Sequence, residues 1–151
     1  MTFPDAMLRL LLAAGLGAAL GLEREYRQKP AGLRTNILIA LGAALFTMLS
    51  LTITENASSA DRIAAQIVTG IGFLGGGAIL RGRGSVHGMT TAATIWVNAA
   101  IGMAAGSGQH AIAAATAAIT LLVLVVLGPI ERYFERRERL TKKVAEHTRR
   151  D

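Results

Sequence analysis

Apolar and charged residues follow one another in blocks along this chain of 151 residues. A soluble domain of this size would intersperse charges along its helices. Predominantly apolar blocks of about 17 to 20 residues are instead typical of helices that cross a bilayer core of roughly 30 Å. The apolar blocks are residues 3–22, 35–53, 63–80, 89–105 and 110–127. We therefore predict an all-α membrane protein with five transmembrane helices.

The segments between these blocks carry polar and turn-forming residues. A polar turn, 54–61, separates the second and third helices, and a glycine-rich loop, 81–88, separates the third and fourth. Gly106-Ser107-Gly108-Gln109 predicts a tight turn into the fifth helix. The pair Gly128-Pro129 ends that helix, because proline cannot continue it. We therefore divide the chain into a transmembrane domain, 1–129, and a charged, cytoplasmic and helical tail, 130–151.

A cleaved signal peptide is the alternative interpretation of the first block. Its apolar stretch, 7–19, has about the right length for one. Two features oppose this interpretation, because no Lys or Arg precedes the stretch and a strongly basic segment follows it. A membrane-spanning helix explains both features better.

The distribution of basic residues predicts the orientation of the helices. With five spans, 14 of the 16 Lys and Arg residues fall on one side, in the loops after the first and third helices and in the tail. Only Arg9 and Arg62 fall on the other side. The positive-inside rule then places the N-terminus outside and the C-terminus in the cytoplasm. Topology also explains the net charge of +6, so we expect the lipid bilayer and no nucleic acid as a partner.

The first two helices are similar to the third and fourth at an offset of about 55 residues. Gly15-Leu16-Gly17 matches Gly70-Ile71-Gly72, and Gly32-Leu33-Arg34-Thr35 matches Gly88-Met89-Thr90-Thr91. Both units would run in the same direction, which predicts a parallel repeat of two helices. Chance similarity between spans rich in small residues is the alternative.

Glycines spaced four residues apart predict close helix packing, because the G-x-x-x-G pattern lets two backbones approach each other. The pairs are Gly17/Gly21, Gly72/Gly76 and Gly102/Gly106. Such faces serve equally for contacts within the chain, with a second copy of it, or with another membrane protein. The segment from Gly70 to Gly75 also matches the dinucleotide-binding pattern G-x-G-x-x-G. It lies in an apolar span with no preceding strand, so we reject that interpretation.

Few polar side chains within the spans are candidates for function. Asn98 follows Trp96 by two residues, and we expect it to hydrogen-bond across helices, with ion contact as the alternative. No span carries a carboxylate at its centre, and no nucleophile–base pair predicts an enzyme. The three histidines have no spacing typical of a metal site. We therefore expect no cofactor, and Mg²⁺ only as a ligand or a transported ion.

Two carboxylates at the end of the first helix are candidates for binding magnesium. Mg²⁺ is usually bound through one or two carboxylates and retained waters, which Glu23 and Glu25 could supply. Arg24 and Arg27 stand beside them and oppose a cation. Internal pairing of glutamate with arginine is the simpler interpretation.

Several ordered motifs resemble the MgtC/SapB family of bacterial membrane proteins. The similarity covers about residues 8–127, and its motifs are Glu23-Arg24 with Arg27, Ala31–Thr35, Gly70–Ile79, Gly88–Trp96 and Ala99–Gly102. The resemblance implies a multi-pass inner-membrane protein linked to growth under low magnesium and, in pathogens, to survival inside host cells. It also implies a role in magnesium homeostasis, as a membrane regulator or as an ion-conducting component. The alternative that it implies is an interaction module that modulates another membrane complex, such as the ATP synthase, without transport.

The resemblance also implies a short form of the family. Its best-known members carry a cytoplasmic ACT-like domain after the last span, whereas this chain ends after a charged tail. We expect a functional site, if the protein has one, at the cytoplasmic side, where the two basic loops could meet near Glu23, Arg24 and Arg34. The candidate residues, from the residues themselves and from the resemblance, are Glu23, Arg24, Arg27, Arg34, Thr35, Arg81, Thr90, Thr91, Trp96 and Asn98.

Overall fold

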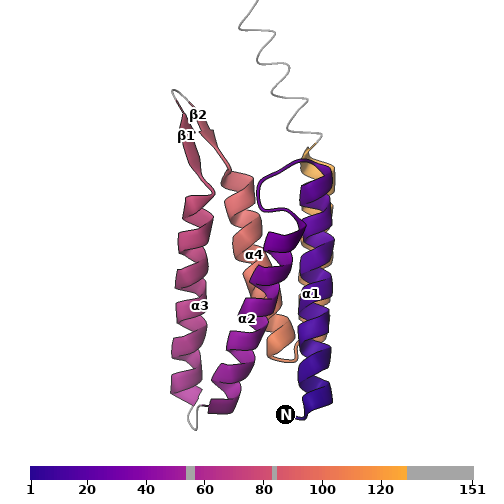
Figure 1. Cartoon of the computed structure of the whole chain (residues 1–151), viewed down its shortest axis with the longest axis vertical. Helices are drawn as coiled ribbons and strands as arrows, with labels where there is room; N and C mark the ends of the chain where they lie inside the picture. The colour runs from indigo at the N-terminus through magenta and orange to yellow at the C-terminus, as the bar shows by residue number, and fades with distance from the viewer. Residues whose placement is uncertain (54–56, 83–84, 129–151) are drawn as a thin grey trace, which may run out of the picture.

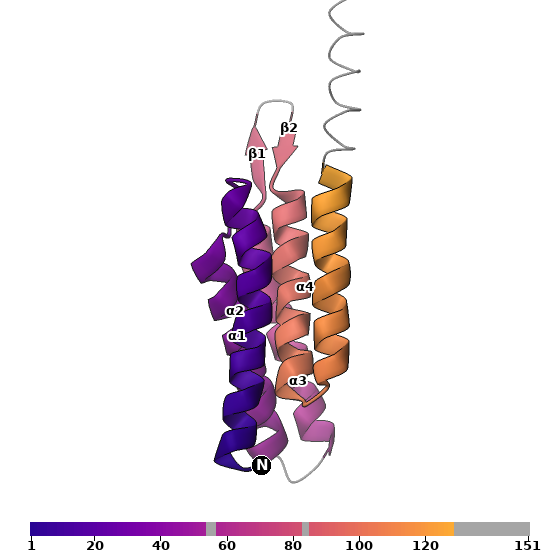
Figure 2. The same cartoon turned by 90° about the vertical axis from the view of Figure 1, so that its right-hand side faces the viewer.

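The computed structural model describes residues 1–53, 57–82 and 85–128, which form a bundle of long helices (Figure 1). A short antiparallel hairpin of two strands lies between the third and fourth helices. The elements are α1 (Phe3–Tyr26), α2 (Leu33–Ile53), α3 (Ala57–Gly77), β1 (Leu80–Gly82), β2 (Ser85–His87), α4 (Met89–Gly106) and a fifth helix, His110–Gly128. Consecutive helices run in opposite directions, so the bundle has a hairpin end and an N-terminal end (Figures 1 and 2).

The predicted helix positions are close to the observed ones, with three differences. The helix α1 continues to Tyr26, because the charged residues after Leu22 include a Glu–Arg pair at helical spacing that supports another turn. The helix α3 begins at Ala57, inside the predicted polar turn, and ends at Gly77. The predicted loop 81–88 contains strands β1 and β2, with Arg81 opposite Val86. The tail 130–151 lies outside the described residues.

The helix α2 lies at the centre of the described bundle, in contact with α1, α3 and α4 (Figure 1). Its buried faces consist mainly of alanine and other compact residues, such as Ala40 and Ala44, which let neighbouring backbones approach closely. The fifth helix packs beside α1 and α4 through Ala113 and Ala117 (Figure 2). Small side chains therefore set the spacing of the core.

Two of the three glycine pairs lie at close helix crossings. A side chain at Gly17 would meet the backbone oxygen of Asn36 at 2.7 Å, and one at Gly21 would meet the Cα of Leu33 at 2.7 Å. Gly102 and Gly106 lie equally close to the backbone of α2, at Ala40 and Ala44. The α1–α2 and α2–α4 crossings therefore leave no room for a methyl group.

The third pair, Gly72 and Gly76 of α3, packs against no part of the described chain. Neither position has a neighbouring atom within 4 Å of where a Cβ would lie. Of the contacts that such a glycine face could serve, a close contact within the described chain is therefore not one that this pair makes. The physical reason is that α3 makes its closest glycine contact one residue away, where a Cβ at Gly75 would lie 3.5 Å from the backbone oxygen of Ala92 in α4.

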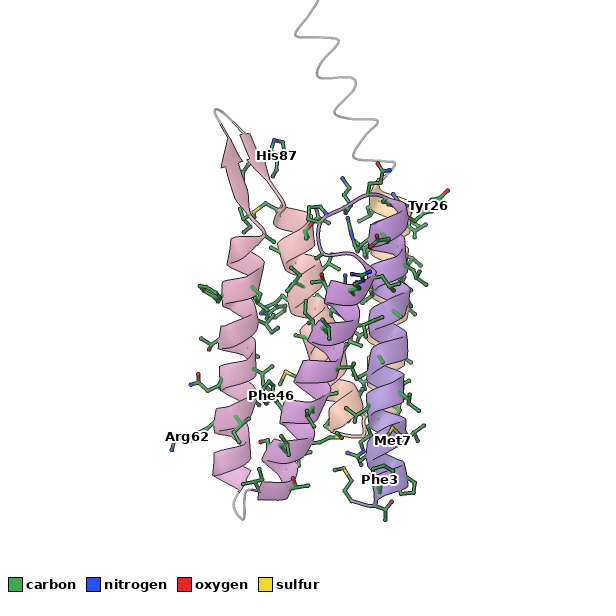
Figure 3. The ribbon with its side chains drawn as sticks, viewed as in Figure 1. Phe3, Met7, Tyr26, Phe46, Arg62 and His87 are labelled. Atoms are coloured by element: carbon green, nitrogen blue, oxygen red, sulfur yellow. The ribbon has the colours of Figure 1, made fainter. Side chains whose placement is uncertain are left out.

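Large apolar side chains cover the outside of the bundle. Phe73 is 83% exposed, and Leu11, Phe46 and Leu122 are each more than half exposed. Figure 3 shows Phe3 and Tyr26 pointing outward from opposite ends of α1. Among the described helices, α1, α2 and His110–Gly128 are long and apolar enough to cross a membrane. An apolar surface of this extent fits a bilayer and not water.

Candidate functional site

Three charged side chains gather at the last turn of α1, at the hairpin end. The side chain of Glu23 is only 8% exposed and lies between two arginines. Its Oε1 is 2.6 Å from the Nε of Arg27, and its Oε2 is 3.7 Å from the Nε of Arg24. Arg24 is buried, so this carboxylate offsets positive charge that would be costly to remove from water alone. Glu23, Arg24 and Arg27 form what we call the α1 charge cluster.

Arg27 also connects the α1 charge cluster to the fifth helix. Its guanidinium donates a hydrogen bond to the backbone oxygen of Val125, with a nitrogen–oxygen distance of 3.1 Å. Val125 lies in the last turn of His110–Gly128, where backbone carbonyls have no partner within the helix. A cation at that position also interacts favourably with the helix dipole. Arg27 therefore both neutralises Glu23 and fastens the end of the fifth helix.

Glu25 supports the start of α2. Its Oε2 accepts a hydrogen bond from the backbone N–H of Leu33, the first residue of that helix, at 3.0 Å. A side chain at Gly32 would collide with the same carboxylate, which explains the glycine there. Gln28 and Ala31 have positive φ values of 53° and 58°, so the connecting loop takes a conformation that L-residues rarely adopt. The loop is therefore shaped by specific contacts.

A buried pair of asparagines links α2 with α4. Asn36 and Asn98 are both fully buried. The Nδ2 of Asn98 donates to the backbone oxygen of Asn36 at 2.7 Å and lies 3.1 Å from its Oδ1. The Nδ2 of Asn36 donates in turn to the backbone oxygens of Ala31 and Gly32 in the loop. A continuous set of hydrogen bonds thus runs from the loop at the hairpin end into the bundle.

One acceptor of this pair remains unused in the part of the chain that the structure describes. The Oδ1 of Asn98 is buried and has no hydrogen-bond partner there. The nearby Thr94 differs, because its hydroxyl donates a hydrogen bond to the backbone oxygen of Thr90 at 2.8 Å. The Asn98 oxygen is thus a buried carbonyl-type acceptor that remains available.

A second polar contact fastens the N-terminal end of the bundle. Arg9 forms an ion pair with Asp5 at 3.0 Å and donates to the backbone oxygen of Gly106 at 2.8 Å. The turn after α4 passes over this guanidinium at Gly108, whose φ of +85° suits glycine. Arg9 therefore holds α1 against the α4 turn, at the end opposite to the α1 charge cluster.

Comparison with known protein families matches residues 10–133 of the chain to the MgtC family. The chain belongs to the MgtC family. The resemblance found in the sequence motifs is thus confirmed, and the apolar helices agree with a membrane protein.

Curated relatives of this family are identical to the chain at about half of the aligned positions. Protein MgtC of Salmonella typhimurium LT2 is 50% identical over 121 residues, covering 80% of this chain and 52% of its own length. The Escherichia coli K12 protein named "Putative magnesium transporter YhiD" is 47% identical over 129 residues, covering 81% and 60%. The uncharacterized protein slr0014 of Synechocystis is 46% identical over 133 residues, covering 88% and 56%. The chain thus spans little more than half the length of these relatives. No solved structure matches it.

The MgtC-like motif residues fall into buried and exposed groups. Thr91 is buried beside Asn98 on the same helix, whereas Arg34, Thr35 and Thr90 are exposed. Trp96 is about half exposed, on the side of α4 that faces away from the asparagines. Arg81 lies in β1, and its side chain is outside the described residues. The structure therefore brings together Glu23, Arg24 and Arg27, and it does not bring Arg34 into that cluster.

Sequence reasoning missed Asn36, the residue that connects the loop to Asn98. A usable signal was present, because Asn36 is an amide within an apolar span, as Asn98 is. Asn36 directly follows the motif Gly32–Thr35 at the start of the predicted span, where a polar residue is ordinary. The described residues contain no group of three His, Asp or Glu side chains that could hold a metal ion. The interior polar residues instead bind one another and the backbone.

Proposed function

We propose that this chain is a multi-pass protein of the bacterial inner membrane that serves magnesium homeostasis as a regulator. Its relatives include the protein named "Putative magnesium transporter YhiD", which supports the link to magnesium. The proposed activity is binding and modulation of other membrane components. The five-span arrangement, with the hairpin end in the cytoplasm, is part of the proposal and follows from the basic residues.

The closed interior of the bundle carries this proposal. Glycines of α1 and α4 press against α2 so closely that a Cβ at Gly17 would lie 2.7 Å from the Asn36 backbone. A hydrated divalent cation keeps its water tightly and needs a wide polar path. The α1–α2 and α2–α4 crossings, where the asparagine pair lies, offer no such width. Regulation through contacts therefore fits the geometry better than conduction through one bundle.

Ion conduction is the second candidate, and one observation favours it. The buried Oδ1 of Asn98 has no partner among the described residues and lies within the same asparagine pair as the Oδ1 of Asn36. Amide oxygens are of the ligand type that hard cations prefer. A conducting form would have to separate α2 from α4 at this pair.

Reconstitution separates the two candidates. Purified protein in liposomes containing a magnesium-sensitive dye should give no more Mg²⁺ entry than empty liposomes do. In bacteria that lack their own family member, expression should change growth at limiting magnesium. Asn98→Ala tests the ion path that the second candidate requires at the asparagine pair. Leu122→Ala, on the exposed face of the fifth helix, is the matched control.

The results have distinct meanings. Mg²⁺ entry that is present in the wild type, lost in Asn98→Ala and kept in Leu122→Ala would establish conduction and overturn the regulatory proposal. Growth at limiting magnesium that does not depend on the chain would contradict the link to magnesium itself.

A further inference from the structure

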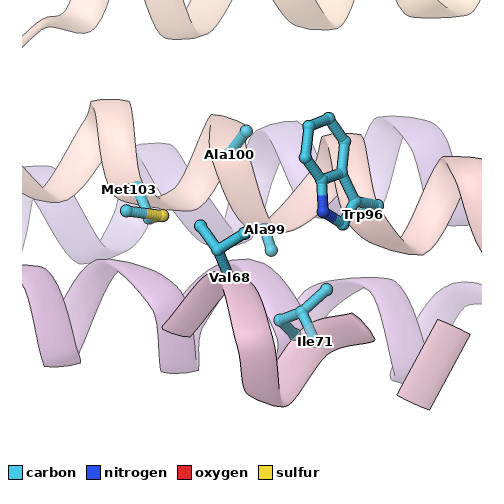
Figure 4. A pocket seen from close by; sticks show the side chains of 6 residues that line it. All are labelled: Val68, Ile71, Trp96, Ala99, Ala100 and Met103. Carbon is cyan, nitrogen blue, oxygen red and sulfur yellow. The ribbon is translucent and has the colours of Figure 1, made fainter. Parts of the chain in front are cut away.

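A pocket opens between α3 and α4 on the outside of the bundle (Figure 4). It has a volume of about 270 Å³, and every residue that lines it is apolar or aromatic. The lining residues are Val68, Ile71, Trp96, Ala99, Ala100 and Met103. The pocket exists because the small side chains of Ala99 and Ala100 on α4 leave space beside α3. At this level of the bundle α3 contributes two aliphatic side chains to the lining, Val68 and Ile71. Such a groove on a membrane-facing surface suits a hydrocarbon chain.

The pocket lies at a depth that falls within a bilayer core. Trp96 lies seven residues into α4 from Met89, which is about 10 Å at the helical rise, and Met103 lies about 21 Å from Met89. Half of a bilayer core is about 15 Å thick. The pocket therefore begins below the hairpin end and extends past the middle of the membrane. An acyl chain that descends from the headgroup layer at the hairpin end would pass through it.

The end of the bundle above the pocket carries positive charge. The hairpin that joins these two helices contains Arg81 in β1, and Arg34 is exposed in the first turn of α2. Basic sites between helices at the cytoplasmic side favour anionic headgroups. Figure 4 shows the Trp96 nitrogen on the side of its ring that faces Val68 and Ile71. The indole thus forms part of the apolar wall at the upper end of the pocket.

We propose that the α3–α4 pocket binds one acyl chain of an anionic phospholipid whose headgroup lies at the hairpin end. The proposal rests on the membrane placement given above and is independent of whether the protein conducts or regulates. A bound lipid would fill the gap between α3 and α4. The helix α3 also carries the glycines that have no close neighbour, Gly72 and Gly76. The relative position of α3 would then depend on membrane composition.

Native mass spectrometry of the full chain in detergent tests this proposal. The protein is mixed with phosphatidylglycerol or with phosphatidylcholine of the same acyl chains, and the lipid-bound fraction is measured. Ala100→Trp and Val68→Phe fill the pocket from opposite walls, and both original residues are exposed, so the fold tolerates the changes. Ala115→Trp, on the exposed face of the fifth helix, is the matched control. Far-UV circular dichroism verifies that each variant is folded.

The expected result is a preference for phosphatidylglycerol that falls about fivefold or more in both pocket variants and is unchanged in Ala115→Trp. Arg81→Gln should reduce binding of phosphatidylglycerol only, whereas Arg62→Gln, at the N-terminal end, should not. Figure 3 shows Arg62 pointing away from the bundle there.

Three outcomes would overturn the proposal. These are equal binding of the two lipids, binding that both pocket variants leave unchanged, and a dimer that the pocket variants abolish. The last result would assign the pocket to a second copy of the chain. Magnesium flux is measured separately, so failure here leaves the proposed function standing.

Discussion

Asn36 and Asn98 place two amide side chains in an environment where each unpaired polar atom is costly. A buried donor or acceptor without a partner costs about 1–3 kcal/mol. The Nδ2 of Asn98 avoids this cost by donating to the backbone and side-chain oxygens of Asn36, and the Nδ2 of Asn36 avoids it by donating to the backbone oxygens of the loop. Within this pair, the Oδ1 of Asn98 is the one side-chain atom that lacks a hydrogen-bond partner among the described residues. This pair therefore fixes the contact between α2 and α4 more specifically than alanine packing alone would.

The first prediction concerns the energy of this pair. Asn98→Ala should lower the free energy of unfolding by about 1–2 kcal/mol, because Asn36 loses its donor while remaining buried. A double-mutant cycle with Asn36→Ala should give a coupling energy of about 0.6–1.7 kcal/mol. Unfolding by sodium dodecyl sulfate in mixed micelles, followed by circular dichroism, measures both values.

Thr69→Ala provides the control for this cycle. Its hydroxyl bonds only to the backbone of its own helix at Ala65, on an exposed face. It should show no coupling with Asn98→Ala. Additive costs for the two asparagines would mean that their hydrogen bonds contribute nothing to the α2–α4 contact.

At the scale of the helices, glycine pairs with the same spacing have opposite roles. Gly102 and Gly106 lie against the α2 backbone, and Gly72 and Gly76 face open space. The pattern G-x-x-x-G creates a flat helix face, but the face becomes a contact only where another backbone is brought to it. In α3 the open face leaves a surface that the lipid or another membrane component can reach.

The second prediction compares the same substitution at these two faces. Gly102→Ala should destabilise the bundle by about 1–3 kcal/mol, because the new methyl group overlaps the backbone of Ala40 and α4 must shift. Gly72→Ala should be neutral or should stabilise α3 by about 0.5–1 kcal/mol, since alanine is the better helix former. Thermal unfolding in detergent measures the difference. Equal damage from both substitutions would contradict the assignment of the α3 face as open.

At the scale of the whole molecule, apolar side chains cover the outside and small or paired polar residues fill the inside. This arrangement explains why α4 carries two threonines and an asparagine that are buried, although Thr90 at its start is exposed. Thr91, Thr94 and Asn98 are buried, whereas Met89 and Trp96 of the same helix are exposed. A helix of this kind can lie in a membrane, because its polar groups face the bundle.

The third prediction tests the orientation. The chain has no cysteine, so single substitutions give unambiguous labelling sites. Gln109→Cys, in the exposed turn at the N-terminal end, should react with a membrane-impermeant maleimide added to intact cells from outside. Lys29→Cys, exposed at the hairpin end, should react only after the cells are opened. The reverse pattern would show that the N-terminus is cytoplasmic.

The sequence by itself determined where the helices lie and what covers them. Local rules decide these properties, since predominantly apolar blocks predict long helices and charged or glycine-containing segments predict their ends. The helix α4 was predicted to begin at Met89, where it does begin, and the fifth helix ends at Gly128, beside a proline. The motifs also determined the family, because they are read directly from residue order.

The tertiary structure alone decided which residues meet. Asn36 and Asn98 are 62 positions apart, and Arg27 and Val125 are 98 apart, so each contact depends on how two helices are rotated against each other. Glu23 pairing with Arg27 was foreseeable from spacing within one helix, whereas the burial of Arg24 and the open face of Gly72 were not. Sequence spacing fixes the face of a helix on which a residue lies, and only packing decides what that face contacts.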